Sequence, residues 1–483
     1  MTRSNVTRRR FLSGGAAALG AVLLAACAAP APTAVPSKPA APPKPAEAAK
    51  PAEAPKAAAP SKAAPQINLN WITPAAVGLE RDFYTSFMKD YETRNANIKI
   101  QVSFEAWNDY FVKLPTVLAS GSIPDSIHLH GSIAQDYGLR GAVKNLFDYM
   151  KRDNIDKNLY FEPLIQQMAD YKTGTKLWAL PKDSAAYAFY INKEMFEKAG
   201  IPFPKRDWSF TEFREVAKKL TKDKNGRSSG ETGFDEKSIV QWGIAWSDPL
   251  PSGDAWQMTA WGVAGPWYNE NYTKPYFDNP DHVQFLQAIA DMRNKDRSIP
   301  TAGDAMGQGD PWRNGLVAMT IAHHAHVFFY NAEKKTFKFD VTNAPGGKLG
   351  QFQGVACSGF TVPAKAPNAD EGWNFVKFLC GEEKQCEIVS AKRWGSAVKP
   401  CEKNLMPADN NPPSFKEILI DPLMGEAKVK TQGILYPPFL SDMKQVWQTE
   451  YDPVFNGGSI TAADASKKAQ PQIQALLDKA AKM

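Results

Sequence analysis

The sequence predicts an α/β fold with two lobes behind a long N-terminal tether, and two features of the chain predict it. After residue 66, segments with the alternation of strands and segments with helical spacing of apolar residues follow one another, which is typical of βαβ units around a mostly parallel sheet. This part of the 483-residue chain is also too long for a single hydrophobic core, so we expect two lobes. The chain has no run of about 18 apolar residues, so the sequence predicts no membrane-spanning helix.

The first 26 residues have the features of an export signal. Residues 7–12 (TRRRFL) form a twin-arginine pattern, and residues 13–26 form a short, weakly apolar run that suits a signal peptide. The run ends in Leu-Ala-Ala before Cys27, which resembles the lipobox of bacterial lipoproteins. We therefore predict that Cys27 is lipidated and anchors the exported protein to the outer face of the cell membrane; a signal peptide with a chance cysteine is the alternative.

Residues 27–66 are the predicted tether. Of the 39 residues after Cys27, 16 are Ala and 11 are Pro, a composition that cannot build a core and favours a solvated, partly polyproline-II linker. Such a linker would keep the folded body at the membrane surface and let it move there.

The formal net charge of +6 comes from this N-terminal part. The first 66 residues carry nine Lys and Arg against two Glu, so the rest of the chain has a net charge of −1. Because binding to phosphates requires a basic surface, we predict that nucleic acid is not a partner.

Local patterns predict the first elements of the body. Residues 67–71, 98–102 and 126–130 read as strands, the first two from clear alternation. Residues 79–91 place aromatic side chains on one helical stripe, and residues 110–118 also read as a helix.

Later elements are predicted mainly from their N-terminal signals. Residues 209–212 (SFTE) form a capping box before an apolar helical pattern, and Asn279-Pro280 is an N-cap followed by proline at the first helical position. Residues 318–322 read as a buried strand, and Thr461 with Asp464 brackets the start of a last helix.

Several longer segments carry a family resemblance. They are GSIPDSI at 121–127, KLWALP at 176–181, AFYINKEMFEKAGIP at 188–202, WRNGLVAM at 312–319 and the helical segment 370–378. In this order they resemble the family 1 extracellular solute-binding proteins of bacterial ABC importers, the group that includes maltose-binding protein. The resemblance extends over residues 67–483, with one departure: isoleucine at 191 stands where the family usually has tyrosine.

The resemblance implies the type II periplasmic-binding-protein fold. Lobe 1 would comprise residues 67–182 and 350–400, and lobe 2 residues 183–343 and 413–483. The chain would cross between the lobes near residues 183–188, 343–350 and 400–413. A ligand would lie between the lobes, and closure around it would present one surface of a monomer to the membrane permease.

Tryptophans at loop edges indicate the ligand. A sugar ring has apolar C–H faces that pack on aromatic rings and hydroxyl groups that bind carboxylates and amides. We therefore expect a carbohydrate or polyol ligand, with two to four tryptophans in the cleft. The predicted ligand-binding residues are Trp71, Trp107, His130, Asp183, Tyr187, Trp246, Trp256, Trp261, His324, Trp394 and Tyr436. Arg393, next to Trp394, is a single candidate for an anion contact.

Histidines and cysteines leave alternatives open. His128 and His130 alternate on one strand, and His323, His324 and His326 follow another; we expect hydrogen-bonding histidines and no metal, although a metal site is the alternative. The cysteines at 357, 380, 386 and 401 allow two disulfides with three possible pairings, or buried free thiols.

Catalytic motifs and cofactor motifs are lacking. The chain has no H-E-x-x-H, P-loop or G-x-G-x-x-G sequence, so we predict a binding protein without a cofactor rather than an enzyme. The alternative is a surface glycan hydrolase or a metal-dependent hydrolase, because the distance between paired carboxylates cannot be read from sequence.

Overall fold

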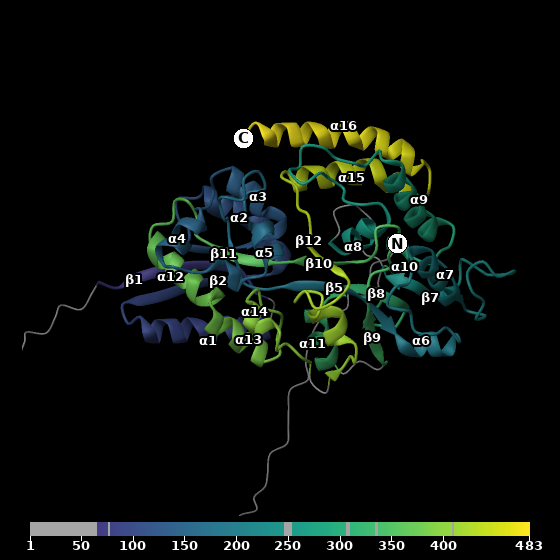
Figure 1. Cartoon of the computed structure of the whole chain (residues 1–483), viewed down its shortest axis with the longest axis horizontal. Coiled ribbons are helices and arrows are strands. Elements are labelled where there is room, and N and C mark those ends of the chain that lie inside the picture. The colour runs from purple at the N-terminus through teal and green to yellow at the C-terminus, as the bar shows by residue number, and fades with distance from the viewer. Residues whose placement is uncertain (1–64, 76–77, 246–253, 306–309, 334–336, 408–409) are drawn as a thin grey trace, which may run out of the picture. The chain divides into compact units, whose positions relative to one another are not determined.

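The structure is a computed structural model that describes residues 65–75, 78–245, 254–305, 310–333, 337–407 and 410–483 (Figure 1). The predicted signal peptide, Cys27 and the tether before residue 65 lie outside the described residues. The described part of the chain belongs to one compact unit that contains two β-sheets.

The first sheet is built mainly from the start of the chain. Its strands occur in the order β2-β1-β3-β11-β4, with β2 and β3 parallel to β1, and β3 and β4 antiparallel to β11. The strands are β1 (Ile67–Pro74), β2 (Ile98–Glu105), β3 (Ser126–His130), β4 (Leu180–Pro181) and β11 (Ser358–Thr361). The three strands predicted before residue 131 are confirmed.

The second sheet is built mainly from the middle of the chain. Its order is β12-β10-β5-β8-β7-β6, and β9 also pairs with β5. The strands are β5 (Ala185–Asn192), β6 (Lys222–Asp223), β7 (Ile239–Ala245), β8 (Val317–His323), β9 (Phe339–Thr342), β10 (Phe352–Ala356) and β12 (Lys430–Gly433). The strand predicted at 318–322 is β8.

The sheets are mixed rather than mostly parallel, so that part of the prediction is wrong. Strand β5 runs antiparallel to β8, β9 and β10, and β11 runs antiparallel to β3. The physical reason is connectivity. A crossover helix returns the chain in the same direction, whereas β5 and β11 enter their sheets directly from the other sheet.

Two short segments carry the chain between the sheets. Residues 182–184 connect β4 to β5, and Cys357 alone connects β10 to β11. The two segments lie side by side, because the Lys182 backbone N–H donates to the Ser358 carbonyl at 2.9 Å. Strand β10 belongs to the second sheet, although the sequence-based boundary placed residues from 350 onward in lobe 1.

Helices cover the sheets and follow the predicted start signals. In α7, the Ser209 hydroxyl accepts from the Glu212 backbone N–H and the Glu212 carboxylate accepts from the Ser209 N–H, which confirms the capping box. Asn279 and Thr461 cap α9 and α16 as predicted. The helices are α1 (Leu79–Arg94), α2 (Trp107–Ala119), α3 (Gly131–Leu139), α4 (Leu146–Arg152), α5 (Glu162–Met168), α6 (Lys193–Lys198), α7 (Phe210–Leu220), α8 (Asp254–Val263), α9 (Pro280–Asn294), α10 (Ala302–Ala305), α11 (Ala325–Ala332), α12 (Ala369–Cys380), α13 (Glu382–Ser390), α14 (Lys399–Glu402), α15 (Leu440–Phe455) and α16 (Ala462–Ala481), with short turns η1 (Lys157–Leu159) and η3 (Lys416–Ile420).

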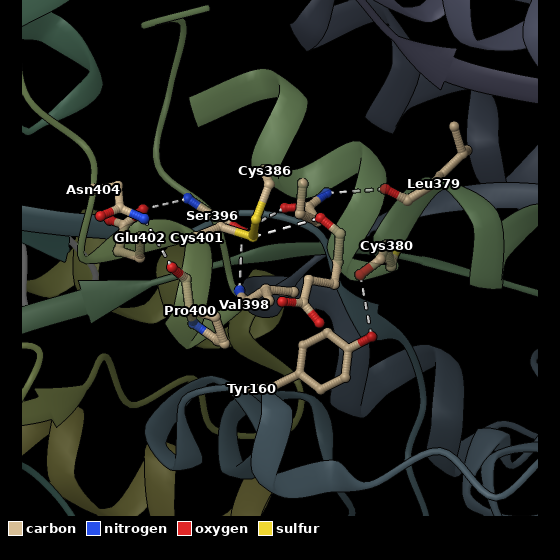
Figure 2. Close-up of a disulfide and its surroundings, with 12 residues drawn as sticks. Tyr160, Leu379, Cys380, Cys386, Ser396, Val398, Pro400, Cys401, Glu402 and Asn404 are labelled. Carbon is tan, nitrogen blue, oxygen red and sulfur yellow. Dashed lines mark hydrogen bonds between the residues drawn. A yellow bond between two sulfur atoms is a disulfide. The ribbon is translucent and has the colours of Figure 1, made fainter. Parts of the chain in front are cut away.

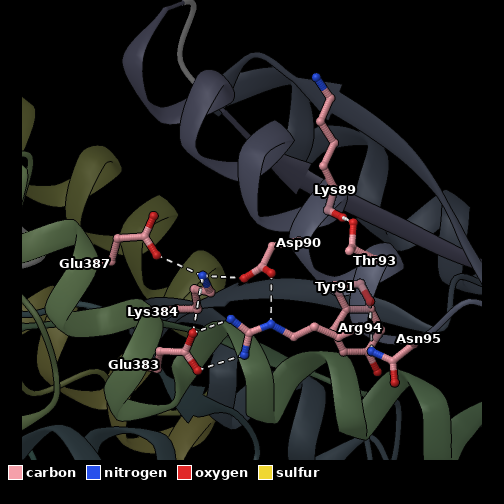
Figure 3. A network of polar contacts seen from close by, with 9 residues as sticks. All are labelled: Lys89, Asp90, Tyr91, Thr93, Arg94, Asn95, Glu383, Lys384 and Glu387. Atoms are coloured by element: carbon pink, nitrogen blue, oxygen red, sulfur yellow. Dashed lines mark hydrogen bonds and ion pairs between the residues drawn. The ribbon is translucent and has the colours of Figure 1, made fainter. Parts of the chain in front are cut away.

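An ion-pair network fastens α13 to α1 (Figure 3). Arg94 of α1 donates to both carboxylate oxygens of Glu383, at 2.9 and 2.5 Å. The nearly buried ammonium of Lys384 lies 2.5 Å from Asp90 and 2.8 Å from Glu387. Because several charges share this network, it links the two helices more specifically than one isolated surface pair would. It thereby positions the loop that follows α13.

Candidate functional site

A cavity of about 850 Å³ lies where the two sheets meet. Its wall takes residues from α2, β3 and α3 on the side of the first sheet, and from β5, β8, α11 and α15 on the side of the second. Both crossing segments and the loop after α13 complete the wall. This volume is within the range of small-molecule sites, so the cavity is the candidate ligand cleft.

Strand ends bring distant residues together in this cleft. His130 is the last residue of β3, and His323 is the last residue of β8. The carboxyl ends of strands open into the crevice where open α/β sheets bind ligands.

Aromatic rings form much of the wall. Trp107 at the start of α2 is 48% exposed and contacts Phe111 edge-on, with ring centres 5.0 Å apart. Phe329 of α11 is 42% exposed on the opposite side of the cleft. Trp394 packs against Phe83 at 5.8 Å. Exposed aromatic faces in a cavity are surfaces on which the C–H face of a sugar ring can pack.

The crossing segments are held by a buried ion pair. The Lys182 side chain is 6% exposed, and its Nζ lies 2.7 Å from Asp183 Oδ2 and 3.8 Å from Glu80 Oε1. The other oxygen of Asp183 accepts from the Ser358 backbone N–H at 2.7 Å. Burial alone would lower the pKa of Lys182, but the Asp183 carboxylate, the Tyr84 hydroxyl and Glu80 raise it well above its ordinary value. Lys182 therefore stays charged, and Asp183 joins the two crossing segments.

A second buried polar cluster lies behind the wall. Glu402 of α14 accepts from the Ser184 hydroxyl at 2.8 Å and from the Ser396 N–H at 2.6 Å. His324 Nδ1 accepts from the Ala186 N–H at 2.9 Å, and its Nε2 lies 3.4 Å from Glu402 Oε1. Burial raises the pKa of Glu402 to about 8 and lowers the pKa of His324 to about 4. The cluster connects a crossing segment, the end of β8 and α14.

One disulfide closes the loop that carries Trp394 (Figure 2). It joins Cys386 of α13 to Cys401 of α14. Cys357 and Cys380 are buried free thiols, and burial raises the pKa of each well above its ordinary value. The alternative of two disulfides is therefore wrong, because Cys357 lies in a crossing segment and Cys380 faces the Leu180 carbonyl.

Five predicted ligand-binding residues line the cleft. They are Trp107, His130, Asp183, Tyr187 and Trp394. They come from α2, β3, a crossing segment, β5 and the loop after α13, so the fold brings together residues that are nearly 290 positions apart in sequence. Whether they contact a ligand stays a prediction.

The other predicted residues lie elsewhere. Trp71 is 1% exposed, and its ring packs against Tyr84 and Phe375, with centres 5.2 and 5.1 Å away. Strand alternation explains this placement, because Trp71 shares the inward face of β1 with Leu69. Trp256 and Trp261 are buried in α8, and His324 is buried behind the wall. Tyr436 lines a different hollow and lies next to the His130 ring. Trp246 lies outside the described residues.

Several cleft residues were not predicted from sequence. Phe111, Lys182, Phe329 and Lys444 line the wall. Phe111 and Phe329 follow predicted strands and could have been found from that position. Lys444 has no local signal, because it reaches the cleft only through the packing of α15.

The metal-site alternative and the search for membrane-spanning helices can be compared with the structure. Among the described residues, no group of three or more His, Cys, Asp and Glu side chains lies close enough to hold a metal ion. No helix within the described ranges is long and apolar enough to cross a membrane.

Comparison with known proteins identifies similar chains. Residues 78–385 match the family described as bacterial extracellular solute-binding protein. An uncharacterised lipoprotein of Streptomyces antibioticus is 23% identical over 310 residues, which covers 60% of this chain and 61% of that protein. The chain thus spans less than two thirds of that relative's length.

Solved structures share the fold. An ABC substrate-binding protein of Listeria monocytogenes, in complex with cycloalternan, superposes with a TM-score of 0.71 at 21% identity, covering 86% of this chain and 99% of that one. A solute-binding protein of Thermotoga lettingae, bound with α-D-tagatose, has a TM-score of 0.68 at 19% identity, with 86% and 100% coverage. At these identities the likeness shows the fold, which is the two-lobe architecture expected from the sequence.

Proposed function

Because the chain belongs to the family of bacterial extracellular solute-binding proteins, we propose that it binds a carbohydrate or polyol outside the cytoplasm and delivers it, chemically unchanged, to an ABC importer. The observation that carries this proposal is the cleft itself. It lies between two sheets, both crossing segments line it, and exposed rings face it from both sides.

The wall suits a ligand with apolar faces and many hydroxyl groups. Trp107 and Phe329 offer ring faces from opposite sides of the cleft. His130, Tyr187 and Ser132 place polar atoms between them. The ligands of the Listeria and Thermotoga relatives, cycloalternan and tagatose, belong to this chemical class.

The ligand drives closure of the lobes in this proposal. We assign residues 67–182 and 350–400 to lobe 1, with the exception of β10, and residues 183–343 and 413–483 to lobe 2. A ligand that contacts both lobes stabilises the closed state by the difference between its affinities for the closed and open states. Residues 182–184 and Cys357 are short and paired, so they can act as the hinge.

A thermal-shift screen tests the binding function. A ligand that binds only the folded protein raises the melting temperature of the protein. We expect at least one monosaccharide, oligosaccharide or polyol to raise it. Trp107→Ala should weaken the affinity for that ligand by about tenfold or more, because a stacked aromatic contact contributes of the order of 1 kcal/mol in addition to the free energy of burying its area. Trp71→Phe, which changes only a core ring, is the matched control. Release of a cleaved product would instead support a hydrolase.

We also propose that Cys27 anchors the monomeric protein to the outer face of the membrane, with the permease as its partner there. The lipobox pattern and the Streptomyces lipoprotein support this proposal. Cys27→Ser should move the protein from the membrane fraction to the soluble fraction. Unchanged fractionation would rule out the lipid anchor.

A further inference from the structure

The charged side chains of the cleft do not balance. Three cations line it, namely Lys182, Arg393 and Lys444, against two carboxylates, Glu80 and Asp183. Both carboxylates lie within 4 Å of Lys182, at 3.8 and 2.7 Å. These three groups form one compact cluster with a net charge of −1. Arg393 and Lys444 lie outside this cluster, so the charged side chains of the cleft sum to +1.

Arg393 and Lys444 make no ion pair with any residue in the described part of the chain. Neither side chain makes an ion pair or a hydrogen bond there, and Arg393 Nε is buried without an acceptor. The Arg393 guanidinium lies 5.7 Å from the centre of the Phe83 ring, which supports it without neutralising it. His323 also lines the cleft, and it is uncharged because burial lowers its pKa well below the ordinary value.

The two cations approach the cleft from opposite sides. Arg393 follows α13, a helix that packs on α12 and is fastened to α1, both of which belong to the first sheet's layer. Lys444 lies in α15, which packs mainly on α9 and α16 beside the second sheet and also touches α3 (Figure 1). An anionic group between them would therefore contact both halves of the molecule.

The loop that carries Arg393 is held in place. The disulfide between Cys386 and Cys401 closes it (Figure 2). Gly395 also pairs with Ser184 of the crossing segment. A restrained guanidinium loses less freedom on binding than a mobile surface arginine, and its forked donors match the oxygens of a carboxylate or phosphate.

We propose that the ligand is a polyhydroxylated anion, with a carboxylate or phosphate group held between Arg393 and Lys444. The inference rests on the proposed binding function and specifies its substrate class. The hydroxylated body lies against the rings of Trp107 and Trp394, and the anionic group bridges the two cations. Binding of the anion neutralises the excess charge of the cleft and favours closure, because it engages both lobes.

The test compares matched ligands by isothermal titration of the purified protein at low salt. The pairs are glucose with gluconate, glucose with glucose 6-phosphate, and glycerol with glycerol 3-phosphate. The anionic member of at least one pair should bind about tenfold tighter or more than its neutral partner, and its preference should shrink as salt rises. The gluconate pair tests for a carboxylate ligand, and the two phosphate pairs test for a phosphate ligand.

Variants show whether the named cations cause the preference. Arg393→Gln and Lys444→Gln should each reduce the ratio of anionic to neutral affinity by about tenfold. Lys295→Gln, which removes a 71% exposed cation that follows α9 and does not line the cleft, should leave the ratio unchanged. Tighter binding of the neutral partner would overturn this inference and leave the binding function standing. If neither the paired ligands nor any compound of the wider saccharide screen binds, both this inference and the proposed binding function are overturned.

Discussion

The buried carboxyl of Glu402 should make a contribution to stability that falls between about pH 6.5 and pH 8. In the folded protein this buried carboxyl keeps its proton up to a pKa of about 8, whereas its ordinary value is 4.5. The folded state thus binds more protons than the unfolded state between these values, and the contribution of Glu402 to stability is lost as the pH rises through that window.

His324 acts in the opposite direction. Its pKa is about 4 in the folded protein against an ordinary 6.5, so its contribution to stability rises with pH across that interval. The two effects oppose each other up to about pH 6.5. Four further histidines have a pKa that burial lowers, and they add stability with rising pH in the same way until they are neutral in the unfolded state: His128, His282, His323 and His326. Between pH 6.5 and pH 8 the contribution of Glu402 alone is a loss of about 2 kcal/mol, at about 1.4 kcal/mol per pH unit.

Glu402→Gln removes the titrating group and should abolish this contribution. From pH 6.5 to 8.0, the free energy of unfolding should therefore fall by about 2 kcal/mol more in the wild type than in the variant, as measured by urea titration with tryptophan fluorescence without reductant. The comparison cancels the histidine contributions, which both proteins share, and it does not depend on their absolute stability. Glu426→Gln, at a 62% exposed carboxylate, should retain the wild-type pH dependence. The same pH dependence in Glu402→Gln as in the wild type would refute the assignment of the buried proton.

Three further changes test the packing around the cleft. In Gly395→Ala the new Cβ would lie 1.8 Å from His324 Nε2, so we expect a loss of about 1–3 kcal/mol, whereas Gly121→Ala, with open space around it, should be nearly neutral; equal effects would contradict the packing. Replacing Cys386 and Cys401 by serine opens a loop with a sequence separation of 15 residues and should cost about 3 kcal/mol in urea titrations, and a reductant should destabilise the wild type but not the double variant. Trp71→Ala should cost about 3–5 kcal/mol by urea titration; a loss below about 1 kcal/mol would mean that the ring is not a core residue.

Local patterns were sufficient to predict individual elements. The capping box at Ser209 and the alternation in β2 depend on neighbouring residues only, and both are found where they were expected. The pairing of strands was less accessible. Strands β10 and β11 are separated by Cys357 alone yet belong to different sheets, which is decided by tertiary pairing with β5 and β3.

Only part of the site was predicted, because local patterns can be read from the sequence whereas tertiary packing cannot. Trp107 and Trp394 stand at the edges of elements, where loops reach the cleft, and both line it. Trp71 also stands near a strand end, but its phase in the alternation directs the ring into the core. Lys444 could not be found from sequence, because only the packing of α15 brings it to the wall.

Small-angle scattering with and without a ligand from the thermal-shift screen tests the central claim most directly. The account predicts that the two halves close around the ligand, so the radius of gyration decreases on binding and the ligand is recovered intact. Binding that leaves the scattering curve unchanged, or a ligand recovered as product, would contradict it.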